Sequence, residues 1–157
     1  MDISEHLNVL NKKQQSALLK LINQKISKLP DKEGQSFPCL QTSPNLYNYK
    51  ELQPLIKKLK EYISRNFVVT KCWGVYTEGD EITWHQHDAD LSVVYYLRNK
   101  ESVGTLFRGK DKKVVFPKAP ENSLVIFKGN EFHSPPPKKR GGPKMRRYTI
   151  ALNIAFY

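Results

Sequence analysis

The sequence is poor in cysteine and has no long apolar run, and both absences limit what the protein can be. Its two cysteines, Cys39 and Cys72, form no CxxC pair and no framework spacing, so we expect free thiols in a reducing compartment. No apolar stretch approaches the roughly 20 residues that a transmembrane helix needs. The first residues also lack the basic start and apolar middle of a signal peptide. These absences predict a soluble, cytoplasmic protein with no membrane contact.

Acidic residues are scarce relative to basic ones. The 157 residues include 26 lysines and arginines against 15 aspartates and glutamates, which gives a formal net charge of +11. This excess favours an anionic partner, either nucleic acid or an acidic protein surface, although lysines spread over a solvated surface would give the same count. The densest basic segment, residues 138–147, follows three prolines and contains two glycines, a pattern typical of an exposed loop.

The hydrophobic pattern changes character once along the chain. Its length suits a single domain, residues 1–157, with one core. Apolar residues recur at helical spacing over residues 4–29 and 49–65, around an irregular connection at 31–48. We therefore predict helical support over residues 1–66 and a mainly β core, a sandwich or jelly roll, over residues 67–157. The predicted strands are short segments rich in β-branched and aromatic residues: 67–77, 81–87, 91–97, 103–107, 113–116, 123–127, 132–135 and 147–156.

Histidine and aspartate gather in one stretch, residues 84–90. If residues 81–87 form a strand, His85 and His87 face the same way about 7 Å apart and are able to lean onto one metal ion. The only later histidine, His133, is the candidate third ligand. Asp88 and Asp90 are reserve ligands, because on a strand they point to the face opposite His85 and would reach the metal only from a bulge or turn.

A series of motifs then follows in order: Trp73, Tyr76, Gly79, His85-x-His87, Leu91-Ser92-x-x-Tyr95-Tyr96-Leu97, Gly104, Leu106, Asn122-x-Leu124-x-x-Phe127, His133 and Arg147-Tyr148-Thr149-Ile150. Their order and spacing resemble the double-stranded β-helix core of iron(II)- and 2-oxoglutarate-dependent dioxygenases, particularly the small prolyl-hydroxylase-like branch. The resemblance covers roughly residues 50–157.

The resemblance implies a cofactor, a co-substrate and a set of roles. His85, His87 and His133 would hold iron(II), Arg147 would bind the distal carboxylate of 2-oxoglutarate, and Tyr96 would donate to that same carboxylate. Tyr76 would lie near the metal-bound end. Most members of the family have a carboxylate where this chain has His87, so the site here carries one more unit of positive charge. The implied reaction is oxidation by dioxygen, most simply hydroxylation, of a protein or another macromolecule.

Three other functions fit part of the pattern. Residues 76–87 are similar to those of AlkB-like nucleic-acid dealkylases, although Asn153 occupies the place of their second arginine. A cupin-like metal protein would use the same three histidines without 2-oxoglutarate, and Arg147 would have no necessary role in it. A basic nucleic-acid-binding module would need only the charge. Binding of 2-oxoglutarate separates the dioxygenase from the last two.

Overall fold

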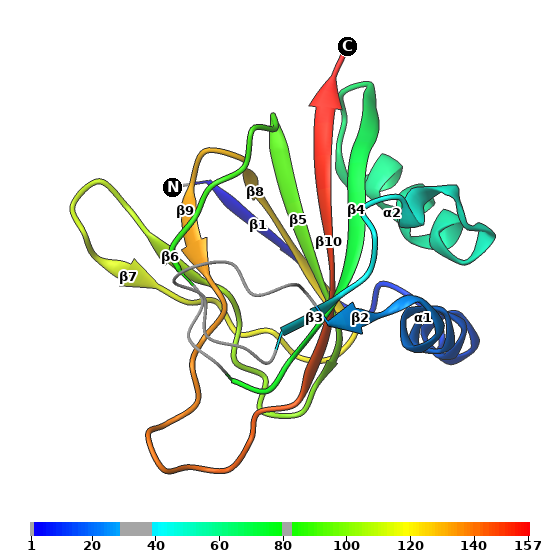
Figure 1. Cartoon of the computed structure of the whole chain (residues 1–157). Helices are drawn as coiled ribbons and strands as arrows, with labels where there is room; N and C mark the ends of the chain where they lie inside the picture. The colour runs from blue at the N-terminus through cyan, green and yellow to red at the C-terminus, as the bar shows by residue number, and fades with distance from the viewer. Residues whose placement is uncertain (1, 29–38, 80–82) are drawn as a thin grey trace.

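The structure, a computed structural model, describes residues 2–28, 39–79 and 83–157. Its strands are β1 (Ile3–His6), β2 (Ser27–Lys28), β3 (Cys39–Gln41), β4 (Phe67–Thr77), β5 (Leu91–Asn99), β6 (Leu106–Arg108), β7 (Val114–Val115), β8 (Ser123–Lys128), β9 (Phe132–Ser134) and β10 (Arg147–Phe156). They form a large antiparallel sheet with the order β1-β8-β5-β10-β4-β3-β2 and a small one with the order β7-β6-β9. The small sheet lies on one side of the large sheet and the helices lie on the other (Figure 1).

Strand β10 runs through the middle of the large sheet and determines what faces the interior. It pairs with β4 on one side and with β5 on the other. Successive side chains of a strand point to opposite faces, and Ile150 and Ile154 belong to the core on the helix side. Arg147, Ala151 and Asn153 therefore project from the other face, into the space between the two sheets.

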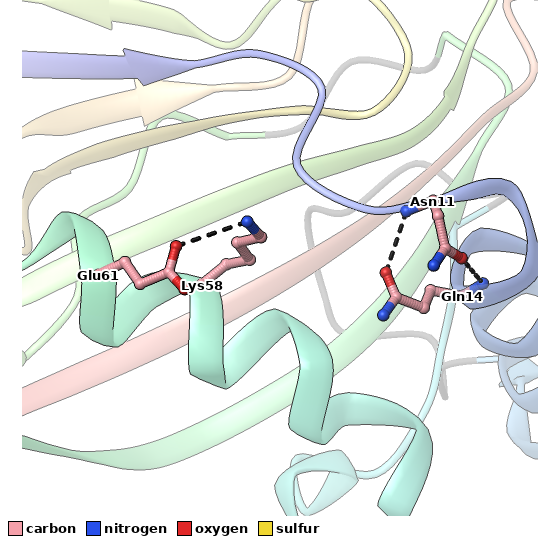
Figure 2. Close-up of polar contacts among 4 residues, drawn as sticks. All are labelled: Asn11, Gln14, Lys58 and Glu61. Atoms are coloured by element: carbon pink, nitrogen blue, oxygen red, sulfur yellow. Dashed lines mark hydrogen bonds and ion pairs between the residues drawn. The ribbon is translucent and has the colours of Figure 1, made fainter.

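Helix α1 (Lys12–Lys25) begins with a capping box (Figure 2). The backbone N–H of Gln14 donates to the Asn11 side chain at 2.8 Å, and the backbone N–H of Asn11 donates to the Gln14 side chain at 3.0 Å. These two bonds satisfy amide groups that have no partner within the helix. The helix packs closely on the sheet at Gly74 of β4, where an added Cβ would lie 2.8 Å from the Ile22 side chain.

Helix α2 (Gln53–Tyr62) follows two short 3-10 turns, η1 (Leu46–Asn48) and η2 (Lys50–Leu52). Pro54 lies in its first turn, where a missing N–H costs little. Leu55 and Leu59 are fully buried, and burial of each contributes roughly 1.5–3 kcal/mol. On the exposed side, Lys58 and Glu61 form an ion pair at 3.5 Å (Figure 2), which contributes at most about 0.5 kcal/mol.

Two hydrophobic cores lie on opposite faces of the large sheet. The larger core fills the layer between that sheet and the helices. The second core lies between the two sheets, where the rings of Phe107 on β6 and Phe127 on β8 meet edge to face at 4.8 Å. It consists of Tyr96, Phe107, Ala119, Val125 and Phe127. This smaller core leaves room beside it for the polar side chains that line the interior.

The predicted strands 67–77 and 147–156 are confirmed at both ends, and most of the others differ by one to three residues. The prediction of helix from residue 4 is wrong for residues 4–6. They form β1 instead, the edge strand of the large sheet, which pairs with β8 over four residues, so tertiary hydrogen bonding overrides the local pattern. Within the irregular connection, residues 39–41 form β3, and residues 31–38 lie outside the described part of the chain.

The predicted strand 81–87 is also corrected. Residues 81 and 82 lie outside the described part, and residues 83–87 are irregular except for one bridge, between His85 and His133. Among the described residues, no helix is long and apolar enough to cross a membrane.

Candidate metal centre

Three histidines from two distant segments meet between the sheets. His85, His87 and His133 each offer a ring nitrogen, and these three atoms lie within 4.8 Å of one another. The Nε2 atoms of His87 and His133 are 3.2 Å apart. A metal ion bound at about 2.1 Å from each of two nitrogens sets them about 3.0 Å apart when the angle between them is a right angle, as in an octahedron. The observed separation fits two neighbouring ligands of one such ion.

Backbone hydrogen bonds hold the two segments together. His85 and His133 exchange reciprocal N–H to O bonds, each 3.0 Å long. The backbone N–H of His87 donates to the Gly129 carbonyl at 2.8 Å. An added Cβ on Gly129 would lie 2.1 Å from the Ala89 carbonyl oxygen, so only glycine allows this close approach. The segment carrying His85 and His87 is thus fixed without belonging to a regular strand.

The second nitrogen of two of these rings fixes their tautomer. The Nδ1 of His85 lies 2.9 Å from the Thr83 carbonyl, and the Nδ1 of His133 lies 2.9 Å from the Glu131 carbonyl. A carbonyl only accepts, so each Nδ1 carries the proton and each Nε2 presents a lone pair. Metal-binding histidines usually have this arrangement.

Burial keeps two of the imidazoles neutral. Burial is the largest of the causes that lower the pKa of both His87 and His133 from 6.5 to about 4, and nearby His85 acts in the same direction. At neutral pH both rings are therefore unprotonated and able to bind a cation. Neutral nitrogen ligands suit iron(II), zinc, copper and nickel better than magnesium or calcium.

The two reserve carboxylates do not join this cluster. Asp88 and Asp90 are exposed, and Asp90 accepts a hydrogen bond from the backbone N–H of Phe156 at 2.8 Å. That bond ties the loop to the end of β10. Among the described residues, the three histidines form a potential metal-binding group without a carboxylate.

Arg147, at the start of β10, is buried in the same interior with only 2% of its surface exposed. Its Nε and Nη1 atoms have no hydrogen-bond partner, and burial lowers the pKa of its guanidinium. Buried charges are normally paired, since an unpaired one costs several kcal/mol. This guanidinium therefore fits a site for an anionic group.

Tyr96 lies beside Arg147, with its ring centre 5.8 Å from the guanidinium carbon. Its hydroxyl is fully buried and already contacts Thr105, at 2.7 Å from the hydroxyl Oγ1 and 2.9 Å from the backbone nitrogen. The backbone N–H of Thr105 donates to it, so the phenol oxygen has a fixed position. No sequence pattern predicts this contact of Thr105.

The prediction for Tyr76 is wrong. Its neighbour in the sheet is Tyr148, and their rings are 4.9 Å apart. Its hydroxyl donates to Glu78 at 3.1 Å. Alternation along β4 places it on the face opposite Trp73, whose ring lies 5.7 Å from that of His87. Tyr76 thus points away from the histidines.

Two further polar residues of the interior were not predicted as part of the site. Ser92 and Asn153 sit opposite each other on β5 and β10, and they are 2% and 6% exposed. The Ser92 hydroxyl and the Asn153 side-chain oxygen have no hydrogen-bond partner. Buried polar atoms of this kind usually have a partner, so both are free to bind a ligand.

Comparisons with known proteins establish the fold. No protein-family model matches the sequence, and no curated protein matches it in sequence. Among solved structures, a prolyl hydroxylase from Trichoplax adhaerens, in complex with a peptide fragment of the hypoxia inducible factor oxygen degradation domain, matches with a TM-score of 0.70 and 16% identity over 98% of this chain and 83% of that chain. HygX from Streptomyces hygroscopicus, solved with nickel, 2-oxoglutarate and hygromycin B, matches with a TM-score of 0.70 and 9% identity over 98% and 82%.

A third solved structure with the same architecture is SnoN, a non-heme α-ketoglutarate-dependent epimerase from nogalamycin biosynthesis. It matches with a TM-score of 0.69 and 8% identity over 98% of this chain and 80% of that chain. The predicted fold class is confirmed: the chain has the double-stranded β-helix architecture of 2-oxoglutarate-dependent oxygenases.

Proposed function

We propose that the protein is an iron(II)- and 2-oxoglutarate-dependent oxygenase. One observation carries the proposal: an unpaired, buried guanidinium, that of Arg147, faces the same interior as the three-histidine cluster. A cupin-like metal protein would need the histidines but would gain nothing from burying this charge. The distal carboxylate of 2-oxoglutarate would supply the missing partner, and the planar fork of arginine matches a carboxylate in two parallel hydrogen bonds.

The three histidines fit an iron(II) ion. Three neutral nitrogens gathered on one side leave the remaining positions of an octahedral ion free for a bidentate 2-oxo acid and for dioxygen. When bound, the iron would supply the oxidation chemistry that no side chain of the chain can perform. Because no carboxylate is among the proposed ligands, the ion keeps its full double positive charge, which suits a doubly negative co-substrate.

The remaining side chains would position the co-substrate and exclude water. Thr105 holds the Tyr96 hydroxyl beside Arg147, so Tyr96 would help to orient the distal carboxylate. Phe107 and Phe127 form an apolar wall beside His133. Such a wall excludes bulk water and strengthens the electrostatic attraction of Arg147 for an anion.

For the substrate, we propose a protein or another macromolecule that the enzyme hydroxylates. Fold relatives include a hydroxylase solved with a peptide as well as an epimerase, so the choice of hydroxylation rests on its being the simplest outcome. The unpartnered atoms of Ser92 and Asn153 would bind polar groups of the substrate. The net charge of +11 favours an anionic substrate.

The buried thiol of Cys72 suits a reducing, cytoplasmic setting.

Anaerobic titration tests this proposal. Iron(II) and then 2-oxoglutarate are added to the purified protein without oxygen, and the visible absorption is recorded. A keto acid chelated to iron(II) gives a charge-transfer band, which neither a cupin-like metal protein nor a basic binding module would develop. Iron binding without this band would leave only the cupin-like function, and absence of iron binding would refute both.

A further inference from the structure

The outer face of the small sheet carries a stacked arrangement of aromatic and cationic side chains. Strand alternation turns Arg108 and Phe132 outward, directly opposite each other on β6 and β9. The Arg108 guanidinium carbon lies 4.9 Å from the ring centre of Trp84 and 5.9 Å from that of Phe132. Both contacts are within cation–π range, so the two rings hold the guanidinium in place on the surface.

The hairpin that joins β6 to β7 extends this face with more positive charge. It projects away from the two helices, on the far side of the molecule (Figure 1). Residues 110–116 are all exposed, and Phe116 keeps 63% of its surface in solvent. Five basic residues stand against one acid, Asp111, over residues 106–118; they are Arg108, Lys110, Lys112, Lys113 and Lys118.

Within the part of the chain that the structure describes, these charges have no counterions. Over the described residues, the two ion pairs are Lys58 with Glu61 and Lys144 with Glu78, and neither involves the hairpin. Asp111 accepts a hydrogen bond from the backbone N–H of Lys113 at 3.1 Å, so its carboxylate serves the turn. This exposed patch combines unpaired basic side chains with exposed aromatic rings. A partner that fits it has negative charges and flat groups that stack on those rings.

We propose that this face, formed by Trp84, Arg108, Phe132 and the hairpin 109–118, binds single-stranded nucleic acid. Unpaired bases offer flat faces that stack on aromatic rings and on a guanidinium, while the phosphates between them neutralise lysines. A duplex keeps its bases stacked inside and offers no such faces. An acidic peptide would satisfy the lysines but would leave Phe116 and Phe132 without partners.

The patch and the metal centre lie on opposite faces of the small sheet and use different residues. Phe107 and His133 point inward from β6 and β9, from which Arg108 and Phe132 point outward. Trp84, the neighbour of His85 in the chain, lies against Arg108 on the outer face. Nucleic-acid binding on the outer face therefore does not require iron or 2-oxoglutarate, and it is measured on the protein alone.

Fluorescence anisotropy with a labelled oligo(U) or oligo(dT) of about 12 nucleotides tests the proposal. Five cations engaging phosphates predict a slope of log affinity against log salt of roughly −3.5, at about −0.7 for each neutralised phosphate of a single strand. The triple variant K110E/K112E/K113E should lose most of the affinity and show a shallower slope. Phe116→Ala should weaken binding at least about fivefold, the loss of one stacked base.

A second triple variant separates the patch from the overall charge. Lys20→Glu, Lys57→Glu and Lys60→Glu change the net charge equally, but these exposed lysines lie on the helices at the other side of the molecule. This variant should keep most of the affinity, and circular dichroism checks that both triple variants fold. Equal loss in the two variants would overturn the proposal. Equal binding of polyglutamate or of duplex DNA, or an unchanged affinity for Phe116→Ala, would also overturn it.

Discussion

The Nε2 atoms of His87 and His133 lie 3.2 Å apart, although 46 residues separate them along the chain. Burial lowers the pKa of both rings to about 4, so both are neutral at neutral pH. Without a cation, the Nε2–H of a neutral His87 is able to donate one hydrogen bond to the Nε2 lone pair of His133. A cation between them would replace that single hydrogen bond with two metal–nitrogen bonds, which this separation fits.

The buried guanidinium of Arg147 predicts opposite effects on stability and on binding. Arg147→Met removes an unpaired buried charge, so the free energy of unfolding of the ligand-free protein should rise by about 1–3 kcal/mol. Affinity for 2-oxoglutarate should fall about a hundredfold or more, because a bidentate charged contact is lost, while iron(II) affinity stays the same. Urea unfolding and anaerobic calorimetry measure these quantities. A less stable variant that still binds 2-oxoglutarate would contradict the role of Arg147.

Replacement of His87 tests whether a carboxylate serves at its position. His87→Asp should keep metal binding, because two histidines and a carboxylate also form a suitable three-ligand set. It should weaken 2-oxoglutarate binding, since the site loses one unit of positive charge. His87→Ala should lower iron(II) affinity by roughly tenfold or more, a loss that even outer residues of metal sites cause. If alanine and aspartate behave alike, His87 is not a ligand.

Gly129 is not a proposed metal ligand, but its substitution is expected to lower metal affinity. Gly129→Ala brings a Cβ to within 2.1 Å of the Ala89 carbonyl and 3.1 Å of the His87 carbonyl, so the loop must move and metal affinity should fall. Gly141→Ala is the matched control. Its Cβ meets nothing within 4 Å, although the φ of +72° makes it cost about 1 kcal/mol of stability. Metal affinity in the control should therefore remain at the wild-type value.

The lowered pKa values of His87 and His133 predict how the metal-free protein responds to acid. Both groups titrate near pH 4 when folded and near 6.5 when unfolded. Between these values the unfolded chain binds more protons, so stability should be full above about pH 6.5 and fall as the pH drops toward 4. Urea unfolding with a chelator present, at several pH values, measures this slope. The slope should be smaller in His133→Gln, and an equal slope would exclude His133 as a source.

Much of the fold was predictable because several strands have a clear signal in the amino-acid sequence. Strands β4 and β10 combine β-branched and aromatic residues with flanking turn residues, and both were placed correctly at each end. Spacing paired His85 with His87, and His133 was the third candidate because it is the only later histidine; the structure brings the three rings together. Residues 3–6 were missed because their pairing partner, β8, lies about 120 residues away and leaves no local signal.

Side-chain direction was harder to predict than strand position. The role of Tyr76 in the site rested on the family resemblance, and a period of two along a correctly placed strand does not tell which face of the sheet points inward. The loop carrying His85 and His87 brings both rings to the site without regular alternation, so the predicted strand was wrong while the predicted pair came together. Ser92 and Asn153 became visible as candidates only when their lack of partners was known.

The two tryptophans of the chain face different spaces. Trp73 faces the interior, with its ring 5.7 Å from that of His87, and Trp84 stacks on Arg108 outside. Each is therefore a natural fluorophore for a different event. In a Trp84→Phe variant, quenching of the remaining emission would follow iron(II) entering the centre, whereas in a Trp73→Phe variant it would follow a ligand arriving at the outer face. The protein thus contains its own pair of optical reporters, one for the space between the two sheets and one for the outer face of the small sheet.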